Sequence, residues 1–187
     1  MHPRTQELLD HLAHRRAELR RAVDTVPVEC REQRPAPDRW SVAEVLEHLV
    51  IVENAVTDRF THQVAAARAD GLGPDIETAP VVPTLNVSFV LNRTHRIVAV
   101  EAARPRGTYD AEAAWTALEQ SRERLGAALR DADGISLGTF TRPHPALGEL
   151  NPYQWIAFVG AHEARHAAQI REIGAAVSSA SRSSSSS

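Results

Sequence analysis

Residues 161–167 carry two histidines, His162 and His166, in a stretch whose apolar residues recur at helical spacing. The two imidazoles are four residues apart and share the face of the helix that should point to the core. One helix can bind a single metal ion through two ring nitrogens at this spacing. Neutral imidazole suits zinc, nickel, iron or copper, and suits calcium or magnesium poorly. Core histidines that only form hydrogen bonds are the alternative, and the spacing alone leaves both interpretations open.

The same segment reads His-Glu-Ala-Arg-His, which matches the HExxH pattern of zinc proteases. In those enzymes the glutamate is the general base, and a third metal ligand often lies downstream. Residues 170–187 contain no histidine, aspartate or cysteine, and Glu172 is their one carboxylate. Glu163 also lies off the apolar face, so we expect it beside the site or in solvent. A zinc hydrolase with Glu163 as its base is therefore the weaker hypothesis.

His48 is the natural third ligand, because it lies at the edge of the apolar stripe of another predicted helix, residues 42–69. Ser41 and Glu44 have the spacing of a capping box, and Trp40 precedes the cap as the apolar residue of a staple. Three protein ligands leave coordination positions open, which is typical of catalytic zinc sites. His62 lies about 21 Å further along the same helix, so it cannot share that ion and is expected to be a structural or surface residue.

The remaining apolar periodicity predicts helices over residues 5–26, 110–131 and 152–174, with Asn151 capping the last one and Gly174 ending it. Residues 70–85 and 132–150 are expected to be long loops. Residues 86–103 could form a short helix or an irregular packed segment, with a strand also possible, and we choose helix. The fold class is therefore all-α, a four-helix bundle in residues 1–174. Residues 175–187, which are rich in serine, are expected to form a disordered tail.

Composition bounds the function. With 187 residues the chain is long enough for one domain with a full core, and its net charge is −3. No basic field exists to attract nucleic acid or an anionic membrane. No apolar run is long enough for a transmembrane helix, and the first residues lack the apolar core of a signal peptide. A single cysteine, Cys30, is expected to be a bystander thiol and fits a reducing cytoplasm.

Several other residues have a functional and a structural interpretation. His144 could line the mouth of the site or simply form a turn, and Gln169 could hydrogen-bond a ligand. Asn92, Arg93 and Arg96 could bind an anionic cofactor, although a solvated face is the simpler reading. The residues expected to be structural or solvated are Trp115, Trp155, His11 and His14.

A resemblance to a known family follows from these motifs. Residues 40–49, Trp-Ser-Val-Ala-Glu-Val-Leu-Glu-His-Leu, resemble the opening of the DinB-like superfamily. His144 with Pro145 and Gly148, and then residues 154–170, resemble its last-helix pattern, in which two histidines four residues apart precede Gln169. The resemblance spans about residues 5–174.

The resemblance implies a four-helix bundle in which His48, His162 and His166 hold a divalent metal, with zinc or nickel favoured and iron compatible. Relatives include S-transferases that use low-molecular-weight thiols and mycothiol-dependent isomerases, and dimers are common. The chain is therefore expected to be a cytoplasmic, metal-dependent enzyme that acts on a small molecule and forms a homodimer. A non-enzymatic binding or dimerisation module is the alternative. Residues 70–110 and 132–150 are least alike, so the resemblance names neither substrate nor catalytic residue, and it makes the protease pattern a coincidence.

Overall fold

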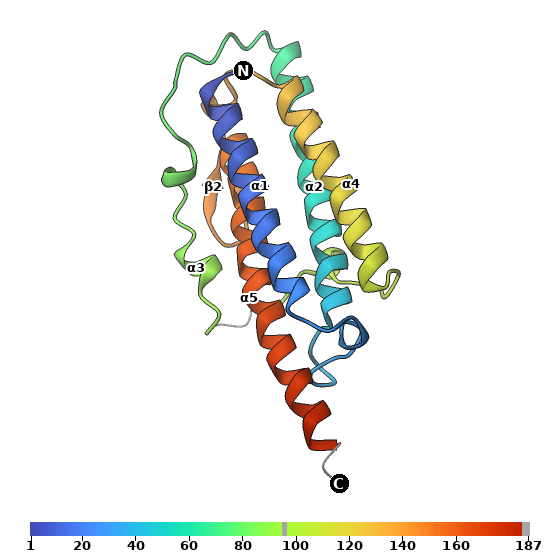
Figure 1. Cartoon of the computed structure of the whole chain (residues 1–187). Coiled ribbons are helices and arrows are strands. Elements are labelled where there is room, and N and C mark those ends of the chain that lie inside the picture. Colours follow the sequence, from blue (N-terminus) through green and yellow to red (C-terminus); the bar gives the residue numbers. More distant parts are fainter. Residues whose placement is uncertain (95–96, 185–187) are drawn as a thin grey trace.

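The computed structural model describes residues 1–94 and 97–184, and it confirms the all-α fold class (Figure 1). Four long helices form the bundle, and a short helix and a two-stranded hairpin lie in the connections. These elements are α1 (Pro3–Asp24), α2 (Val42–Ala69), α3 (Ser88–Leu91), α4 (Ala111–Asp131), β1 (Arg142–His144), β2 (Gly148–Leu150) and α5 (Pro152–Ser184).

The predicted helix starts are confirmed by their caps. At the start of α2, the Glu44 amide donates to Ser41 Oγ at 3.2 Å, and the Ser41 amide donates to Glu44 Oε2 at 2.9 Å. At the start of α5, Asn151 and Gln154 exchange the same two kinds of bond, at 2.9 and 3.1 Å. Each cap satisfies backbone donors that have no partner within the helix. The caps therefore fix where the two histidine-bearing helices begin.

The predicted end of the last helix is wrong, because α5 continues through Gly174 to Ser184. A Cβ at Gly174 would lie 2.8 Å from Val26 Cγ2, so this glycine lets the chain after α1 approach α5 closely. Val177, three residues later, is 4% exposed and extends the buried face. Residues 175–184 of the predicted tail are thus helical, and residues 185–187 lie outside the described part.

Two connections differ from the predictions. In residues 86–103, the regular structure of the described part is limited to α3 and a short 3-10 helix, Glu101–Ala103. Phe89, Val98 and Val100 are 50 to 69% exposed, so the apolar residues there make no buried stripe that would stabilise a longer helix. Residues 132–150 were expected to be a loop but contain the antiparallel β1–β2 hairpin. Its turn ends at Gly148, whose φ of 75° favours glycine.

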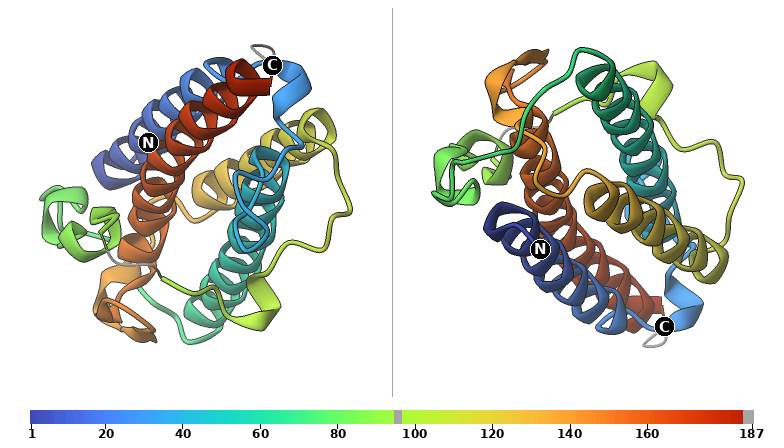
Figure 2. Two further views of the ribbon diagram at one scale, coloured as in Figure 1. Left: turned by 90° about the horizontal axis from the view of Figure 1, so that it is seen from below. Right: turned by 90° about the horizontal axis from the view of Figure 1, so that it is seen from above.

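The long connection after α2 returns along the outside of the bundle, so α4 runs parallel to α2 (Figure 1). Figure 2 shows α1 lying along α5 and α2 lying along α4. The buried apolar residues form two clusters. The first includes Leu12, Phe60, Leu125 and Ile156, and the second includes Leu19, Leu46, Leu118 and Ile170. None of the helices in the described part combines the length and apolar character needed to cross a membrane.

Candidate metal centre

The three predicted histidines converge. His162 Nε2 lies 3.2 Å from His48 Nε2 and 3.0 Å from His166 Nε2. One nitrogen from each ring lies within 4.8 Å of the others. Two nitrogens bound to one tetrahedral zinc ion at 2.0–2.1 Å are separated by about 3.3 Å. The side chains from α2 and α5 are therefore already arranged as a ligand set.

The outer nitrogens of two of these rings are held by hydrogen bonds. His48 Nδ1–H donates to the Ala103 carbonyl at 2.6 Å, and His166 Nδ1–H donates to Gln169 Oε1 at 2.9 Å. Both rings consequently present an Nε2 lone pair to His162. A proton on His162 Nε2 can satisfy one of these lone pairs but not both, whereas a cation satisfies all three nitrogens. The donor set thus fits a divalent metal ion.

The surroundings keep the imidazoles neutral. Burial lowers the pKa of His48. Burial is also the largest cause that holds the pKa of His162 and of His166 well below the usual range, and the neighbouring imidazoles lower both further. Neutral imidazole is the form that binds metal, so protons compete weakly for this site near neutral pH.

Aromatic rings flank the histidines. Trp40 lies with its ring centroid 5.0 Å from that of His48, and Phe158 stacks on His162 at 5.4 Å. His144, on β1, packs against Phe158 with 4.3 Å between ring centroids. Burial, and then the charge of Arg59, lower the pKa of His144 to about 4. His144 thus borders the site through Phe158 and does not reach the three nitrogens as a ligand.

Two neighbours of the ligands hold the long connection against the bundle. Glu47 accepts hydrogen bonds from the amides of Gly107, at 2.8 Å, and Thr108, at 3.2 Å. Arg165 Nη1 donates to the carbonyls of Val90 and Asn92, both at 2.7 Å. Neither Glu47 nor Arg165 was singled out from the sequence, because their partners are backbone groups that carry no motif. The connection between α2 and α4 is therefore bound to α2 through Glu47 and to α5 through Arg165, next to the histidines on each helix.

The anion-binding residues considered from the sequence are engaged elsewhere. Arg93 forms an ion pair with Glu172 at 2.6 Å, and the side chain of Asn92 accepts from the amide of Thr94 at 2.9 Å. Arg96 lies outside the described residues. An anionic cofactor at Arg93 would have to compete with Glu172.

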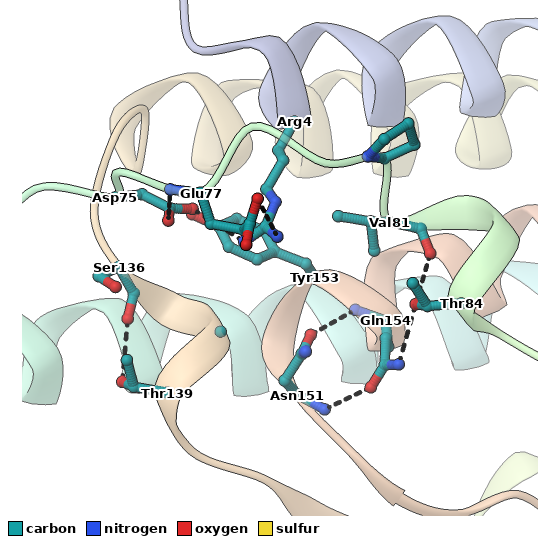
Figure 3. Close-up of a pocket in the computed structure, with 12 residues that line it drawn as sticks. Arg4, Asp75, Glu77, Val81, Thr84, Ser136, Thr139, Asn151, Tyr153 and Gln154 are labelled. Carbon is teal, nitrogen blue, oxygen red and sulfur yellow. Dashed lines mark hydrogen bonds and ion pairs between the residues drawn. The ribbon is translucent and has the colours of Figure 1, made fainter.

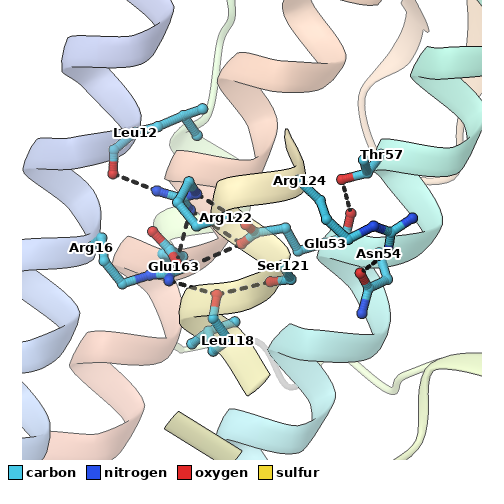
Figure 4. A network of polar contacts seen from close by, with 10 residues as sticks. All are labelled: Leu12, Arg16, Glu53, Asn54, Thr57, Leu118, Ser121, Arg122, Arg124 and Glu163. Carbon is cyan, nitrogen blue, oxygen red and sulfur yellow. Dashed lines mark hydrogen bonds and ion pairs between the residues drawn. The ribbon is translucent and has the colours of Figure 1, made fainter. Parts of the chain in front are cut away.

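Glu163 does not take part in the site. Its side chain is 1% exposed, and its Oε1 lies 2.7 Å from Arg16 Nε and 3.0 Å from Arg122 Nη2 (Figure 4). These arginines belong to α1 and α4, so Glu163 is not in solvent, and its carboxylate binds the two arginines rather than a ligand histidine. A carboxylate held by two guanidinium groups is poorly placed to act as a general base at the histidines.

The other residues expected to be structural do not join the three histidines, although Trp155 packs against His144 and Phe158 with ring centroids 4.7 and 6.1 Å apart. His62 is exposed, Cys30 is buried, and His11 Nε2 lies 3.2 Å from the Ala157 carbonyl oxygen. The two tryptophans, Trp115 and Trp155, are 6 and 7% exposed, as expected of core residues.

A cavity of about 320 Å³ lies at the start of α5, away from the histidines (Figure 3). Its lining includes Arg4, Asp75 and Tyr153, and none of the three converging histidines lines it. Arg4 is paired with Asp75 at 3.3 Å. The cavity and the three-histidine cluster are therefore separate features of the bundle.

Comparison with known proteins places the chain in a family. The model of the DinB superfamily matches residues 11–170, a span that includes all three histidines. The chain belongs to the DinB superfamily. An uncharacterized protein, YuaE of Bacillus subtilis (strain 168), is 29% identical over 144 residues, which are 75% of this chain and 81% of that protein. No solved structure gives a significant match. Family membership agrees with the helical bundle and with the resemblance seen in the sequence.

Gln169 offers a test of the hydrogen bonds around the candidate ligands of this DinB protein. We expect Gln169→Ala to weaken zinc binding by about 10- to 100-fold, because His166 loses the acceptor that fixes its ring. Competition with a chromophoric chelator measures the dissociation constant. Gln6→Ala is the matched control, since Gln6 is exposed and bonds Asp10 on α1. Equal affinities for the two variants would contradict this role.

Proposed function

We propose that this protein is a divalent-metal-dependent enzyme that transfers a low-molecular-weight thiol to an electrophilic small molecule. His48, His162 and His166 would hold the ion, with zinc or nickel favoured and iron compatible. One observation supports the metal: two fixed Nε2 lone pairs, from His48 and His166, and the nitrogen of His162 meet at one point, where a single proton cannot satisfy them. The transfer of a thiol is proposed from the activity of characterised DinB relatives. Three protein ligands leave positions open for a thiol.

A divalent ion held there would lower the pKa of a bound thiol. In the transfer, the sulfur of the thiol would bond an electrophilic carbon while the leaving group departs with its electron pair. The thiol proton would pass to solvent. The chain itself supplies position and shielding. Ala103 and Gln169 orient His48 and His166. Trp40 and Phe158 cover the flanks of the rings and limit the access of water.

A non-enzymatic binding or dimerisation module is the second candidate, and exposed apolar side chains favour it. Phe89, Val98 and Val100 lie 50 to 69% exposed on the connection beside the site. A second copy of the chain could cover them. This alternative expects a variant with all three histidines replaced by alanine to keep its partner. In either case a buried, unpaired Cys30 supports our proposal of a cytoplasmic location.

Elemental analysis of protein purified without added metal tests the first part of the proposal. We expect about one equivalent of zinc, nickel or iron per chain. Less than about 0.2 equivalents, with no uptake when zinc or nickel is added, would remove its basis.

A thiol screen tests the second part. The metal-loaded protein is mixed with bacillithiol or mycothiol and an activated haloaromatic compound, and the loss of free thiol is followed. The control is the protein with His48, His162 and His166 replaced by alanine. Loss of thiol at the same rate in both samples would reject the transferase activity, but it would not contradict metal binding by the three histidines.

A further inference from the structure

Four charged side chains meet in the middle of the bundle, one from each long helix. They are Arg16 of α1, Glu53 of α2, Arg122 of α4 and Glu163 of α5, and we call them the arginine clamp (Figure 4). The two carboxylate side chains are 2 and 1% exposed, and the two arginine side chains are 12 and 16% exposed. Two positive and two negative charges thus balance in a largely buried layer.

Each arginine contacts both carboxylates. Arg16 reaches Glu53 through Nη2 at 2.9 Å and Glu163 through Nε at 2.7 Å. Arg122 reaches Glu53 through Nε at 2.9 Å and Glu163 through Nη2 at 3.0 Å. The planar guanidinium fixes the directions of these bonds. Glu53 and Glu163 are therefore joined through two separate bridges.

Backbone carbonyls hold the two arginines in place. Arg16 Nη1 donates to the Leu118 carbonyl of α4 at 2.8 Å, and Arg122 Nη1 donates to the Leu12 carbonyl of α1 at 2.7 Å. Each guanidinium is thus anchored on the helix that carries the other arginine. The bridges between the carboxylates have little freedom to move.

The arginine clamp separates the two apolar clusters. Along α2, Glu53 lies between Val50 of the second cluster and Val56 of the first. Along α5, Glu163 lies between Val159 of the first cluster and Ala167 of the second. Apolar burial has no direction of its own, so it tolerates small shifts of one helix along another. The charged layer does not tolerate such shifts, because each ion pair needs its own partner at a defined distance and direction.

The clamp also lies close to the histidines in sequence and in space. Glu163 follows His162 directly, and Glu53 lies five residues after His48, about 7.5 Å along α2. A slip of α5 by one residue would move Glu163 by about 1.5 Å and turn it by about 100°, away from both arginines. Such a slip leaves buried charges unpaired, which is strongly unfavourable. It would equally displace His162 from His48.

We propose that Arg16 and Arg122 are positioning residues, which set the spacing and register of α2 and α5 by joining Glu53 to Glu163. The arginine clamp thereby holds His48 at ligating distance from His162 and His166. The effect on helix spacing stands on the ion pairs alone, and its consequence for metal binding rests on the proposed function.

Arg122→Gln and Arg124→Gln form the test pair. Both arginines join α4 to α2, but Arg124 binds Asn54 and Asp58 at the surface. Spin labels at the exposed positions Ala55 and Arg171, introduced in a Cys30→Ala background, report the distance between α2 and α5 in the metal-free protein.

We expect Arg122→Gln to shift or broaden the distance distribution and to weaken zinc binding by at least about tenfold. Arg124→Gln should match the parent in both measurements. Arg122→Lys, which keeps the charge but not the planar fork, should fall between them.

If folded Arg122→Gln has an unchanged distance distribution, the arginine clamp does not position the helices, whether or not the zinc affinity changes. If the parent binds no zinc, the proposed function fails, and the distances still decide whether the clamp positions the helices. If Arg122→Gln does not fold, Glu163→Gln takes its place, because it removes one charge at nearly the same volume. Glu163→Gln is then expected to shift or broaden the distance distribution, and an unchanged distribution would overturn the inference.

Discussion

Replacing His166 by alanine is expected to abolish stable metal binding, from about one equivalent per chain to less than about 0.1 after dialysis. The variant keeps two nitrogens, from His48 and His162, and two imidazoles rarely hold a divalent ion against a competing chelator. It also removes the ring that Gln169 fixes at 2.9 Å. Inductively coupled plasma mass spectrometry gives the stoichiometry, and far-ultraviolet circular dichroism shows that the helices persist.

His62→Ala is the control for this loss, because His62 is an exposed histidine on α2, the helix that carries His48. This variant should keep the full equivalent of metal. If His166→Ala also keeps it with unchanged affinity, the ion binds somewhere other than the three converging histidines. A loss in both variants would point to binding by scattered surface histidines.

Local patterns predicted where the bundle helices begin, because a helix start depends on neighbours in sequence. The Ser41–Glu44 box and the Asn151 cap each lie within four residues of sequence, and both form in the structure. The end of α5 depends on a distant contact. Gly174 is a usual stop signal, but here it accommodates Val26 of another segment, and that requirement appears in no local window.

Helical faces placed His162 and His166 toward the core and His48 at the edge of another core-facing stripe, and the family resemblance implied that the three share one metal ion. The hydrogen-bond acceptor that orients His48 could not be predicted from the sequence. The acceptor for His48 is the carbonyl of Ala103, 55 residues away, and any residue type could supply it. Gln169 was accessible to sequence reasoning because it lies three residues after His166 on the same helix.

Glu163 shows where a single-helix view fails. From its own helix alone we expected it beside the apolar face, although Val159 and Ala167, four residues before and after it, are both buried. Its partners, Arg16 and Arg122, and the second carboxylate that they bind, Glu53, each interrupt the apolar face of their own helix. Two positive and two negative interruptions, one on each long helix, were the signal for a buried charged layer. Comparing the four helices together would have found it.

Glu53→Ala is expected to lower the free energy of unfolding by about 3–5 kcal/mol, the cost of breaking a buried ion pair from one side. The change removes a carboxylate that neutralises both Arg16 and Arg122 and leaves Glu163 alone to balance two buried guanidinium groups. Denaturation of metal-free protein by urea, followed by circular dichroism, measures the loss without any contribution from bound metal.

Asp58→Ala separates burial from charge, because Asp58 is also a carboxylate of α2 paired with an arginine of α4. Its pair with Arg124 has side chains 62 and 54% exposed, so its removal should cost less than about 1 kcal/mol. Equal and small losses in the two variants would mean that water reaches the arginine clamp and that apolar packing alone sets the bundle. A large loss confined to Glu53→Ala would mean that the buried ion pairs of the arginine clamp hold the histidine-bearing helices together.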